Sequence, residues 1–405
     1  MSATRGRIVL LEGIHQAADS VLSAAGLEVD RLDGAVEKER LHEVLAGASM
    51  VGIRSRTQLD AEVLGRLDEL IAIGCFCIGT NQVALEAAAG RGVAVFNAPF
   101  SNTRSVAELT MAEIIMLMRR IPQRSSAMHA GRWLKSVDGS REVRGRTLGI
   151  VGYGHIGSQL SILAEGLGMR VVYHDIVEKL PLGNATSLPD LGSVLEQSDV
   201  VSLHVPATAM TAGLLGAREL QAMKPGAFLI NNARGHIVDL EALGEAIDSG
   251  RLAGAAIDVF PSEPRSGNAT FESPLQGKEN VLLTPHIGGS TLEAQSAIAR
   301  EVGNKLARYG REGATGTAVN LPGVDLPARK DNQHRILHFH KNVPGVLGRM
   351  HSALAGLGVN INAEYLQSQG DLSYVILDVD PVDQRVIDNE LMKIPETIRF
   401  RTIVD

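Results

Sequence analysis

The chain has 405 residues, more than one hydrophobic core usually organises, which predicts two or three domains. Hydrophobic residues make up 44% of the chain, charged residues make up 21%, and the formal net charge is −7. This balance is ordinary for a globular protein and argues against a general nucleic-acid-binding or membrane-binding surface. No apolar run approaches the roughly 18 residues of a membrane span, and no signal-peptide pattern opens the chain, so we expect a cytoplasmic protein.

Short apolar runs alternate with helical patterns over the first hundred residues. The runs that read as buried strands are 8–11, 50–53, 70–73 and 93–96. Such alternation is typical of strand-helix-strand units and predicts a parallel sheet. A helix is predicted next, over about 105–117, where apolar residues recur near helical spacing.

A second alternating series begins at Thr147 and continues to about Gly288. It contains six apolar runs, at 148–151, 170–173, 200–204, 227–230, 255–259 and 281–283. Six strands are the number in a full doubly wound dinucleotide-binding fold. A further helical pattern follows at 291–309, so we expect a discontinuous first domain of residues 1–101 and 289–330, with the dinucleotide-binding domain at 102–288 between them.

The C-terminal part follows a linker rich in Gly and Pro, between about 310 and 333. We expect a separate domain at 331–405, with strands at 336–340, 359–366, 372–379 and 397–403 and helices at 345–355 and 384–392. This order of elements is that of the ferredoxin-like fold. The predicted class is therefore α/β, with two doubly wound parallel-sheet domains followed by a ferredoxin-like domain.

A glycine motif follows the strand predicted at 148–151. Gly152, Gly154 and Gly157 permit a tight turn, a close approach of the backbone to a pyrophosphate, and close packing of the following helix. Asp175 ends the next strand, where a carboxylate can bind an adenosine ribose and repel a 2′-phosphate. The combination predicts NAD as the cofactor, although the nearby Lys179 leaves NADP open.

Three ionisable residues follow three of the predicted strands: Arg234, Glu263 and His286. Ligands of open parallel sheets bind outside the carboxyl ends of the strands, so the three side chains should converge. Oxidation of a secondary alcohol needs a base, which histidine provides, and a carboxylate stabilises the resulting imidazolium. Arginine can hold a substrate carboxylate with two parallel hydrogen bonds. Taken singly, His286 could be an ordinary buried histidine and Glu263 a solvated loop residue.

Asp258 is a fourth ionisable group at this edge of the sheet. Its expected role is to contact the nicotinamide carboxamide, and the alternative is an aspartate that caps a turn.

Five motifs in this region are Gly-Tyr-Gly-His-Ile-Gly, Ser-Leu-His-Val-Pro, Asn-Ala-Arg-Gly, Ala-Ala-Ile-Asp-Val-Phe and Thr-Pro-His-Ile-Gly-Gly. On these motifs the chain, from about residue 8 to 310, resembles the D-isomer-specific 2-hydroxyacid dehydrogenases. The resemblance implies that His286 is the acid/base, Glu263 its partner and Arg234 the substrate-orienting residue. His236 departs from the family pattern, which usually has a small or hydroxyl residue there. The implied cofactor contacts are Gly152, Gly154, His155, Ile156, Gly157, Asp175, Asn232, Ala233, Arg234, Asp258, His286, Ile287, Gly288 and Gly289.

Within that family, the segments 54–57, 73–82 and 96–108 are similar to the members that oxidise 3-phospho-D-glycerate to 3-phosphooxypyruvate, the first step of L-serine biosynthesis. Arg54 and Arg56 lie in the first of these segments, and two arginines on a loop are otherwise most often solvated surface residues. The resemblance makes them ligands of the substrate phosphate, and it implies a homotetramer to which Trp133 contributes a contact. The substrate-binding residues it implies are Arg54, Ser55, Arg56, Asn102 and Lys135.

The last 70 or so residues resemble an ACT domain, a module that senses small molecules. The resemblance implies feedback inhibition by L-serine, bound at His340, Asn342 and Asn360, although Lys341 and Val343 vary within the effector loop. Histidines 334, 338 and 340 could suggest a metal, but no carboxylate or cysteine accompanies them, so we expect no metal site.

Two other functions stay open. One is another D-2-hydroxyacid dehydrogenase activity, or reduction of 2-oxoglutarate. The second is an NAD-sensing binding protein, because relatives of this fold act as corepressors. The intact set of Arg234, Glu263 and His286 favours an enzyme.

Overall fold

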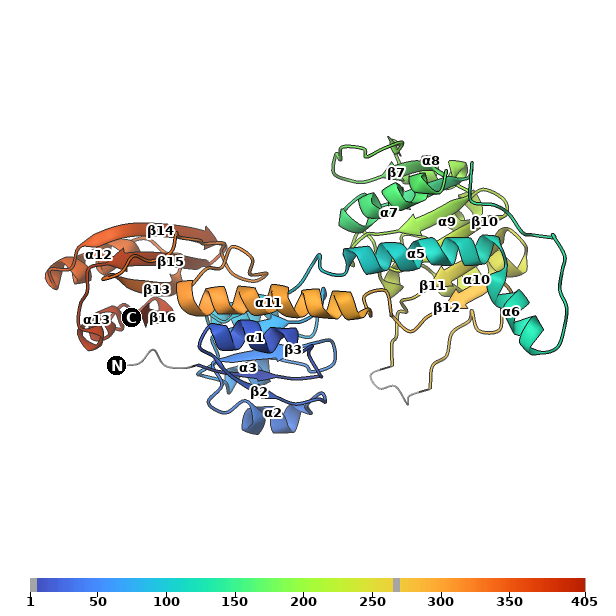
Figure 1. Cartoon of the computed structure of the whole chain (residues 1–405). Helices are drawn as coiled ribbons and strands as arrows, with labels where there is room; N and C mark the ends of the chain where they lie inside the picture. The colour runs from blue at the N-terminus through green and yellow to red at the C-terminus, as the bar shows by residue number, and fades with distance from the viewer. Residues whose placement is uncertain (1–5, 265–269, 405) are drawn as a thin grey trace. The chain divides into compact units, whose positions relative to one another are not determined.

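The computed structural model describes residues 6–264 and 270–404, which belong to two compact units (Figure 1). The first unit comprises residues up to 101 and from 295 onward, and the second comprises 102–294. Among the described residues, no helix combines the length and the apolar character that a membrane crossing requires.

The first unit begins with a five-stranded parallel sheet in the order β2-β1-β3-β4-β5. Its central strands are apolar and fully buried, whereas the edge strand β2 is charged and half-exposed, which is why its sequence predicts no strand. The strands are β1 (Arg7–Leu10), β2 (Glu28–Arg31), β3 (Met50–Ile53), β4 (Ala72–Cys75) and β5 (Ala94–Phe96). The helices are α1 (Ala17–Ala24), α2 (Lys38–Val44), α3 (Ala61–Gly65), α4 (Leu85–Gly90) and the long α11 (Leu292–Glu312).

Helix α11 completes the core of this sheet, although some 200 residues separate it from β5. Ile298, Val302 and Leu306 on one face of α11 pack with Ile8 and Leu10 of β1. Figure 1 shows α11, in orange, beside α1. Helix α11 therefore belongs to the core of the first sheet, although it begins beyond residue 290.

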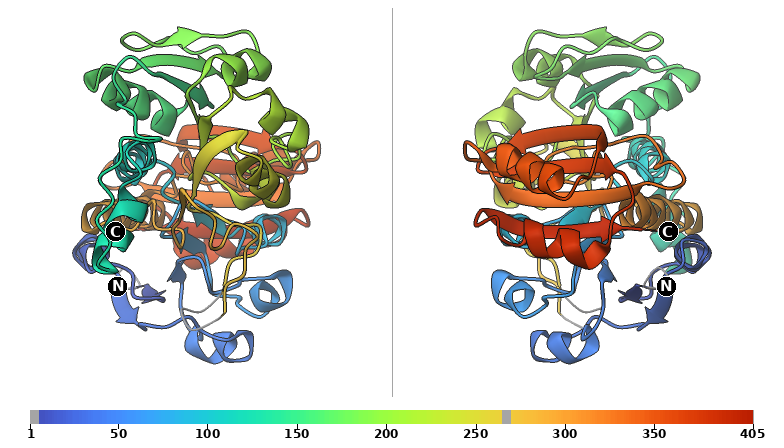
Figure 2. Two further views of the ribbon diagram at one scale, coloured as in Figure 1. Left: turned by 90° about the vertical axis from the view of Figure 1, so that its right-hand side faces the viewer. Right: turned by 90° about the vertical axis from the view of Figure 1, so that its left-hand side faces the viewer.

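The C-terminal domain is a four-stranded antiparallel sheet in the order β14-β15-β13-β16. Helices α12 and α13 cover one face (Figure 2), where Ile336, Val375 and Leu377 are buried beneath them. This is the predicted ferredoxin-like arrangement. Its elements are β13 (His334–Lys341), α12 (Val346–Gly356), β14 (Ile361–Gln369), β15 (Leu372–Val379), α13 (Gln384–Leu391) and β16 (Thr397–Ile403).

The opposite face of the antiparallel sheet packs on the N-terminal part of the unit. The side chains that alternate with the previous set, Leu337, Phe339, Tyr374 and Ile376, belong to the same core as Ile8 and Phe96. Phe339 and Tyr374 are stacked, with ring centroids 3.9 Å apart. The C-terminal domain and the N-terminal sheet are therefore joined by a shared hydrophobic core as well as by the linker.

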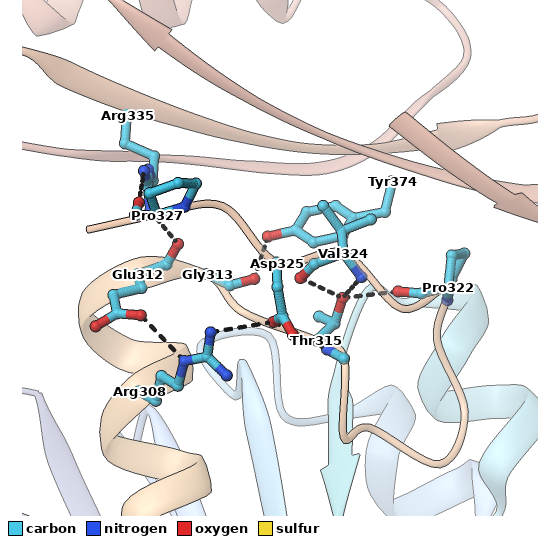
Figure 3. Close-up of polar contacts among 11 residues, drawn as sticks. Arg308, Glu312, Gly313, Thr315, Pro322, Val324, Asp325, Pro327, Arg335 and Tyr374 are labelled. Atoms are coloured by element: carbon cyan, nitrogen blue, oxygen red, sulfur yellow. Dashed lines mark hydrogen bonds and ion pairs between the residues drawn. The ribbon is translucent and has the colours of Figure 1, made fainter. Parts of the chain in front are cut away.

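Side chains of the C-terminal domain also cap the end of α11 (Figure 3). The last carbonyl groups of any helix lack partners within the helix. Here Arg335 donates to the Glu312 carbonyl at 3.2 Å, and the Tyr374 hydroxyl donates to the Gly313 carbonyl at 2.7 Å. Arg401 donates to the carbonyls of Tyr309 and Gly310. Three strands of the C-terminal sheet thus hold the end of one helix.

The second unit is a seven-stranded parallel sheet in the order β12-β11-β10-β9-β6-β7-β8. The six predicted strands are present, and β8 is added; it has two residues, too few for an apolar pattern. The strands are β6 (Thr147–Val151), β7 (Arg170–His174), β8 (Thr186–Ser187), β9 (Val200–Leu203), β10 (Ala227–Asn231), β11 (Leu252–Ile257) and β12 (Val281–Leu283).

From β6 the chain adds β7 and β8 on one side of the sheet and then β9 to β12 on the other side. The change of direction at β6 is the point where such folds bind their ligands. Helices α5 and α7 pack in the core on one face, through residues such as Met111 and Leu160. The helices of this unit are α5 (Thr103–Met118), α6 (Ile121–His129), α7 (His155–Gly166), α8 (Leu191–Gln197), α9 (Ala217–Ala222) and α10 (Leu240–Asp248), with a 3₁₀ turn at Gly235–Ile237.

Candidate active site

The glycine motif forms the turn between β6 and α7, as predicted. Gly152 has φ 91°, and a Cβ atom there would come within 2.6 Å of the His204 carbonyl oxygen. A Cβ atom at Gly157 would come within 2.3 Å of the Gly152 oxygen, so both positions require glycine. A Cβ atom at Gly154 would meet nothing within 4 Å. The turn therefore leaves open space at the N-terminus of α7, where the N–H groups of the first helical turn suit a pyrophosphate.

Asp175 lies directly after β7 and is tied to the glycine turn. One carboxylate oxygen accepts from the Tyr153 N–H at 2.8 Å, and the other accepts from the Val177 N–H at 2.9 Å. The negative charge is thereby fixed beside the turn that would hold the pyrophosphate. This position fits a ribose of NAD and opposes the extra phosphate of NADP.

His286 and Glu263 form the predicted pair at the ends of β12 and β11. The His286 Nδ1 atom lies 2.8 Å from a Glu263 carboxylate oxygen, and the other oxygen accepts from the Phe260 N–H at 3.1 Å. The hydrogen bond that His286 donates to Glu263 raises the pKa of His286 against the opposing effect of burial. Burial favours the neutral form of Glu263, but the hydrogen bond from His286 and its charge outweigh burial and lower the pKa. The pair can therefore accept a proton at the second ring nitrogen.

Asp258 holds the loop that presents His286. Its side chain is fully buried and accepts from the Thr284 hydroxyl at 2.6 Å and from the N–H groups of Ile287 and Gly288, each at 2.8 Å. The loop turns sharply here, because His286 has φ 54°, a left-handed conformation that is uncommon outside glycine. Both carboxylate oxygens of Asp258 thus serve the loop, and its contact with a nicotinamide stays a prediction.

Arg234 follows β10 and acts on the same pair. Its positive charge lowers the pKa of Glu263 and also the pKa of His286, as a minor contribution to each. The side chain is half-buried, and one guanidinium nitrogen donates to the Ala233 carbonyl at 2.6 Å. The structure therefore brings together all three residues of the predicted trio.

Asn232 and Ala233 are both buried, and the Asn232 amide is turned away from the strand edge toward α5. Its nitrogen donates to the Thr110 hydroxyl at 3.0 Å and to the Glu113 carboxylate at 2.6 Å. Burial raises the pKa of Glu113 to about 7. The Asn232 side-chain oxygen has no hydrogen-bond partner among the described residues and is therefore available to a ligand, while the segment before Arg234 rests on a buried carboxyl group.

Sequence reasoning missed Glu113. The signal was present, since Val106, Thr110, Glu113 and Leu117 recur at helical spacing on the buried face of α5. Two polar residues in such a row indicate a buried polar contact.

The remaining residues predicted to contact the cofactor lie at the start of α7 and in the segment before α11. His155 is exposed and Ile156 half-buried in the first turn of α7. Ile287 is 40% exposed, and Gly288 and Gly289 follow it before α11.

The predicted substrate residues lie in both units. Arg54, Ser55 and Arg56 follow β3 in the first unit, and their side chains are half-buried or exposed. Asn102 precedes α5 in the second unit and is buried against Gly289. Lys135 lies in the exposed loop after α6, next to Trp133, which is 77% exposed.

The predicted effector residues lie at two opposite ends of the C-terminal sheet. His340 and Asn342 lie at one end, where Asn342 donates to the Gly370 carbonyl of the turn between β14 and β15. Asn360 lies at the other end, where its carbonyl accepts from the Asp380 N–H, so one chain does not bring the three residues together. His340 is buried and its Nδ1 atom lies 3.2 Å from that of His338, whereas Asn342 and Asn360 are exposed. Burial lowers the pKa of His340, and it lowers that of His338 to about 3. Both imidazoles are therefore neutral near pH 7. No group of three potential metal ligands occurs in the part of the chain that the structure describes.

Comparison with known proteins gives two family matches. Residues 111–288 match the NAD binding domain of D-isomer specific 2-hydroxyacid dehydrogenases, and residues 336–399 match an ACT domain like that of the AHAS small subunit. A D-3-phosphoglycerate dehydrogenase from Escherichia coli is 51% identical over 98% of this chain and 97% of its own. D-3-phosphoglycerate dehydrogenase 1 of Saccharomyces cerevisiae is 46% identical over 93% of this chain and 82% of its own.

Among solved structures, the TT0316 protein of Thermus thermophilus is 35% identical, with a TM-score of 0.68. It covers 77% of this chain and 99% of its own. The similarity to the enzymes from E. coli and yeast extends over nearly the whole chain, the C-terminal domain included. On this evidence the chain belongs to the D-isomer specific 2-hydroxyacid dehydrogenase family.

Proposed function

We propose that this chain is an NAD-dependent oxidoreductase that converts 3-phospho-D-glycerate to 3-phosphooxypyruvate in L-serine biosynthesis, under feedback inhibition by L-serine. The observation that carries the chemistry is the His286–Glu263 hydrogen bond of 2.8 Å, with the charge of Arg234 acting on both residues. The proposed substrate is supported by relatives that are about 50% identical to this chain and are named D-3-phosphoglycerate dehydrogenase.

The mechanism follows from which nitrogen of His286 is available. Because Nδ1 is held by Glu263, the second nitrogen is the one that takes the proton of the substrate hydroxyl. NAD, when bound, would accept the hydride that leaves the carbon carrying this hydroxyl. Glu263 stabilises the imidazolium that forms, and Arg234 orients the substrate carboxylate. In the reverse direction, the imidazolium returns the proton to the carbonyl oxygen.

The anionic ends of the substrate require cations. We assign the phosphate to Arg54 and Arg56, with Lys135 as a further cation, and we assign the carboxylate to Asn102 with Ser55. Residues 1–101 and 289–330 then form the substrate-binding domain, residues 102–288 form the NAD-binding domain and add Asn102 and Lys135 to the substrate site, and residues 331–405 sense L-serine through His340, Asn342 and Asn360. We further propose a cytoplasmic homotetramer, in which the exposed Trp133 loop forms a subunit contact.

Initial rates with NAD and different acids test the proposal. We expect 3-phospho-D-glycerate to be oxidised with a kcat/KM at least about a hundredfold above that of D-glycerate, because the phosphate supplies charge-assisted hydrogen bonds. L-serine should inhibit the rate. Equal rates with D-glycerate and D-lactate would indicate another D-2-hydroxyacid dehydrogenase, and faster reduction of 2-oxoglutarate would indicate a reductase of that acid. Binding of NAD with no turnover of any acid would indicate a sensor.

A further inference from the structure

A buried carboxylate lies beneath the loop that carries Arg54 and Arg56. Glu12 follows β1, has φ 63°, and its side chain is only 2% exposed. The loop follows β3, the strand paired with β1, so both segments leave the same edge of the sheet. Charged residues are rarely buried to this extent unless they are paired or fully hydrogen-bonded.

Three backbone N–H groups of the loop converge on this carboxylate. Thr57 donates to one oxygen at 2.8 Å, Arg54 donates to the same oxygen at 3.3 Å, and Arg56 donates to the other at 3.1 Å. The Arg56 guanidinium lies 3.8 Å from Glu12 as well. From the other side, the Gln82 amide donates to the Arg54 carbonyl at 2.6 Å. Three backbone N–H groups of the loop are therefore bound by Glu12, and one backbone carbonyl is bound by Gln82.

This arrangement has a consequence for anion binding. Loops that bind phosphate often do so with successive backbone N–H groups. Here those groups point at Glu12 and are no longer available to a ligand, whereas the side chains of Ser55 and Arg56 remain exposed. We propose that Glu12 is a positioning residue for substrate recognition: it orders the backbone of residues 54–57 and thereby fixes the positions from which their side chains bind the anionic end of the substrate. The inference rests on the proposed function of this loop.

Charge and position make opposite predictions for Glu12→Gln. The substitution removes a negative charge beside two arginines, so electrostatics alone would tighten the binding of an anion. It also leaves the amide group of the glutamine facing one of the donor N–H groups of the loop. If Glu12 acts by position, the KM for 3-phospho-D-glycerate rises about tenfold or more, with kcat within about threefold of the parent. The KM for NAD should not change.

The experiment measures steady-state kinetics of the full-length enzyme for four variants: Glu12→Gln, Glu62→Gln, Arg54→Gln and Gln82→Met. Glu62 is exposed and on the same domain, so its substitution is matched in charge and should leave all constants unchanged. Gln82→Met removes the second hold on the loop and should raise the KM for phosphoglycerate more modestly, which keeps the test valid if Glu12→Gln does not fold.

The ratio of kcat/KM for 3-phospho-D-glycerate to that for D-glycerate separates the outcomes. A fall of this ratio in Glu12→Gln and in Arg54→Gln supports the proposal. A fall in Arg54→Gln alone, or a lower KM in Glu12→Gln, contradicts the positioning role but leaves the function of the loop intact. No fall in Arg54→Gln contradicts the proposed function of the loop itself. Equal losses with both substrates would reduce Glu12 to a purely structural residue.

Discussion

Two ion pairs, one in each unit, differ in what their surroundings allow. The side chains of His286 and Glu263 are 50% and 37% exposed, and they meet through a single hydrogen bond. Arg335 and Asp378 are 0% and 8% exposed, and two guanidinium nitrogens bind the two carboxylate oxygens at 2.6 and 2.8 Å. Arg335 also donates to the Glu312 and Pro327 carbonyls.

The difference in exposure distinguishes a pair that can exchange protons from a pair that stabilises the fold. A group that exchanges protons with a substrate needs access and a ring nitrogen not held by another residue, and His286 has both: it is half-exposed and only its Nδ1 atom binds Glu263. An arginine does not lose its proton in proteins, so the pair at Arg335 cannot titrate on that side and instead fixes geometry. The first pair lies beside the proposed hydride transfer, and the second joins β13, β15 and the end of α11.

The largest effect is expected for His286→Ala. Loss of the general base should lower kcat for oxidation by about a thousandfold, while the dissociation constant for NAD changes little. Stopped-flow or steady-state rates give the first quantity, and quenching of protein fluorescence by NAD titration gives the second. Turnover that survives would show that another group accepts the proton.

Breaking the buried pair should act on stability. Arg335→Leu leaves Asp378 without its partner and removes a cap from α11, so the free energy of unfolding should fall by about 3 kcal/mol or more. Asp378→Leu should cost a similar amount, and replacing both residues should cost less than the sum of the single changes. Urea denaturation followed by circular dichroism measures these values. Unchanged stability in both single variants would mean that the pair contributes nothing to the fold.

A smaller effect is expected at the effector loop. Asn342→Ala should raise the concentration of L-serine needed for half inhibition by about tenfold, with the uninhibited rate unchanged. Deleting the domain is a poorer test, because Leu337, Phe339 and Tyr374 belong to the core of the first unit. Serine inhibition that is unaltered in Asn342→Ala and in Asn360→Ala would contradict the assigned effector site.

The smallest effect is expected for Asp175→Asn. Both oxygens of Asp175 accept from backbone N–H groups, so asparagine can keep only one of these hydrogen bonds while the negative charge is removed. The preference for NAD over NADP, measured as a ratio of kcat/KM values, should narrow by less than about tenfold. A wider preference would exclude repulsion by Asp175 as the origin of cofactor choice.

The fold is largely predictable because its central strands are apolar runs of ordinary length. The run at 372–379 is bounded by Gly370-Asp371 on one side and a charged segment on the other, and β15 has these same limits. The edge strands β2 and β8 escape prediction, since an edge strand needs few apolar residues and a two-residue strand has no period. The packing of the C-terminal domain is equally hidden, because alternation in β13 does not reveal what each face packs against.

The site is predictable where strand ends bring residues together, as for Arg234, Glu263 and His286. Contacts between side chains and distant backbone are not predictable. Nothing in the pattern around Glu12 indicates that its carboxylate binds the loop at 54–57, and Glu113 is an isolated acid in an apolar helix. Asp258 is correctly singled out by its position, but its three hydrogen bonds to the loop of His286 emerge only in three dimensions.

The pH dependence of kcat/KM for oxidation, in the parent enzyme and in Glu263→Gln, tests the central claim most directly. Oxidation requires neutral His286, whose pKa is raised above its ordinary 6.5 chiefly by the hydrogen bond to Glu263. The rate should therefore rise with pH through a midpoint above 6.5 in the parent. In Glu263→Gln the rate should be lower, and the midpoint should move to lower pH. An identical midpoint in both proteins would contradict the assignment of His286 and Glu263 as the acid/base pair.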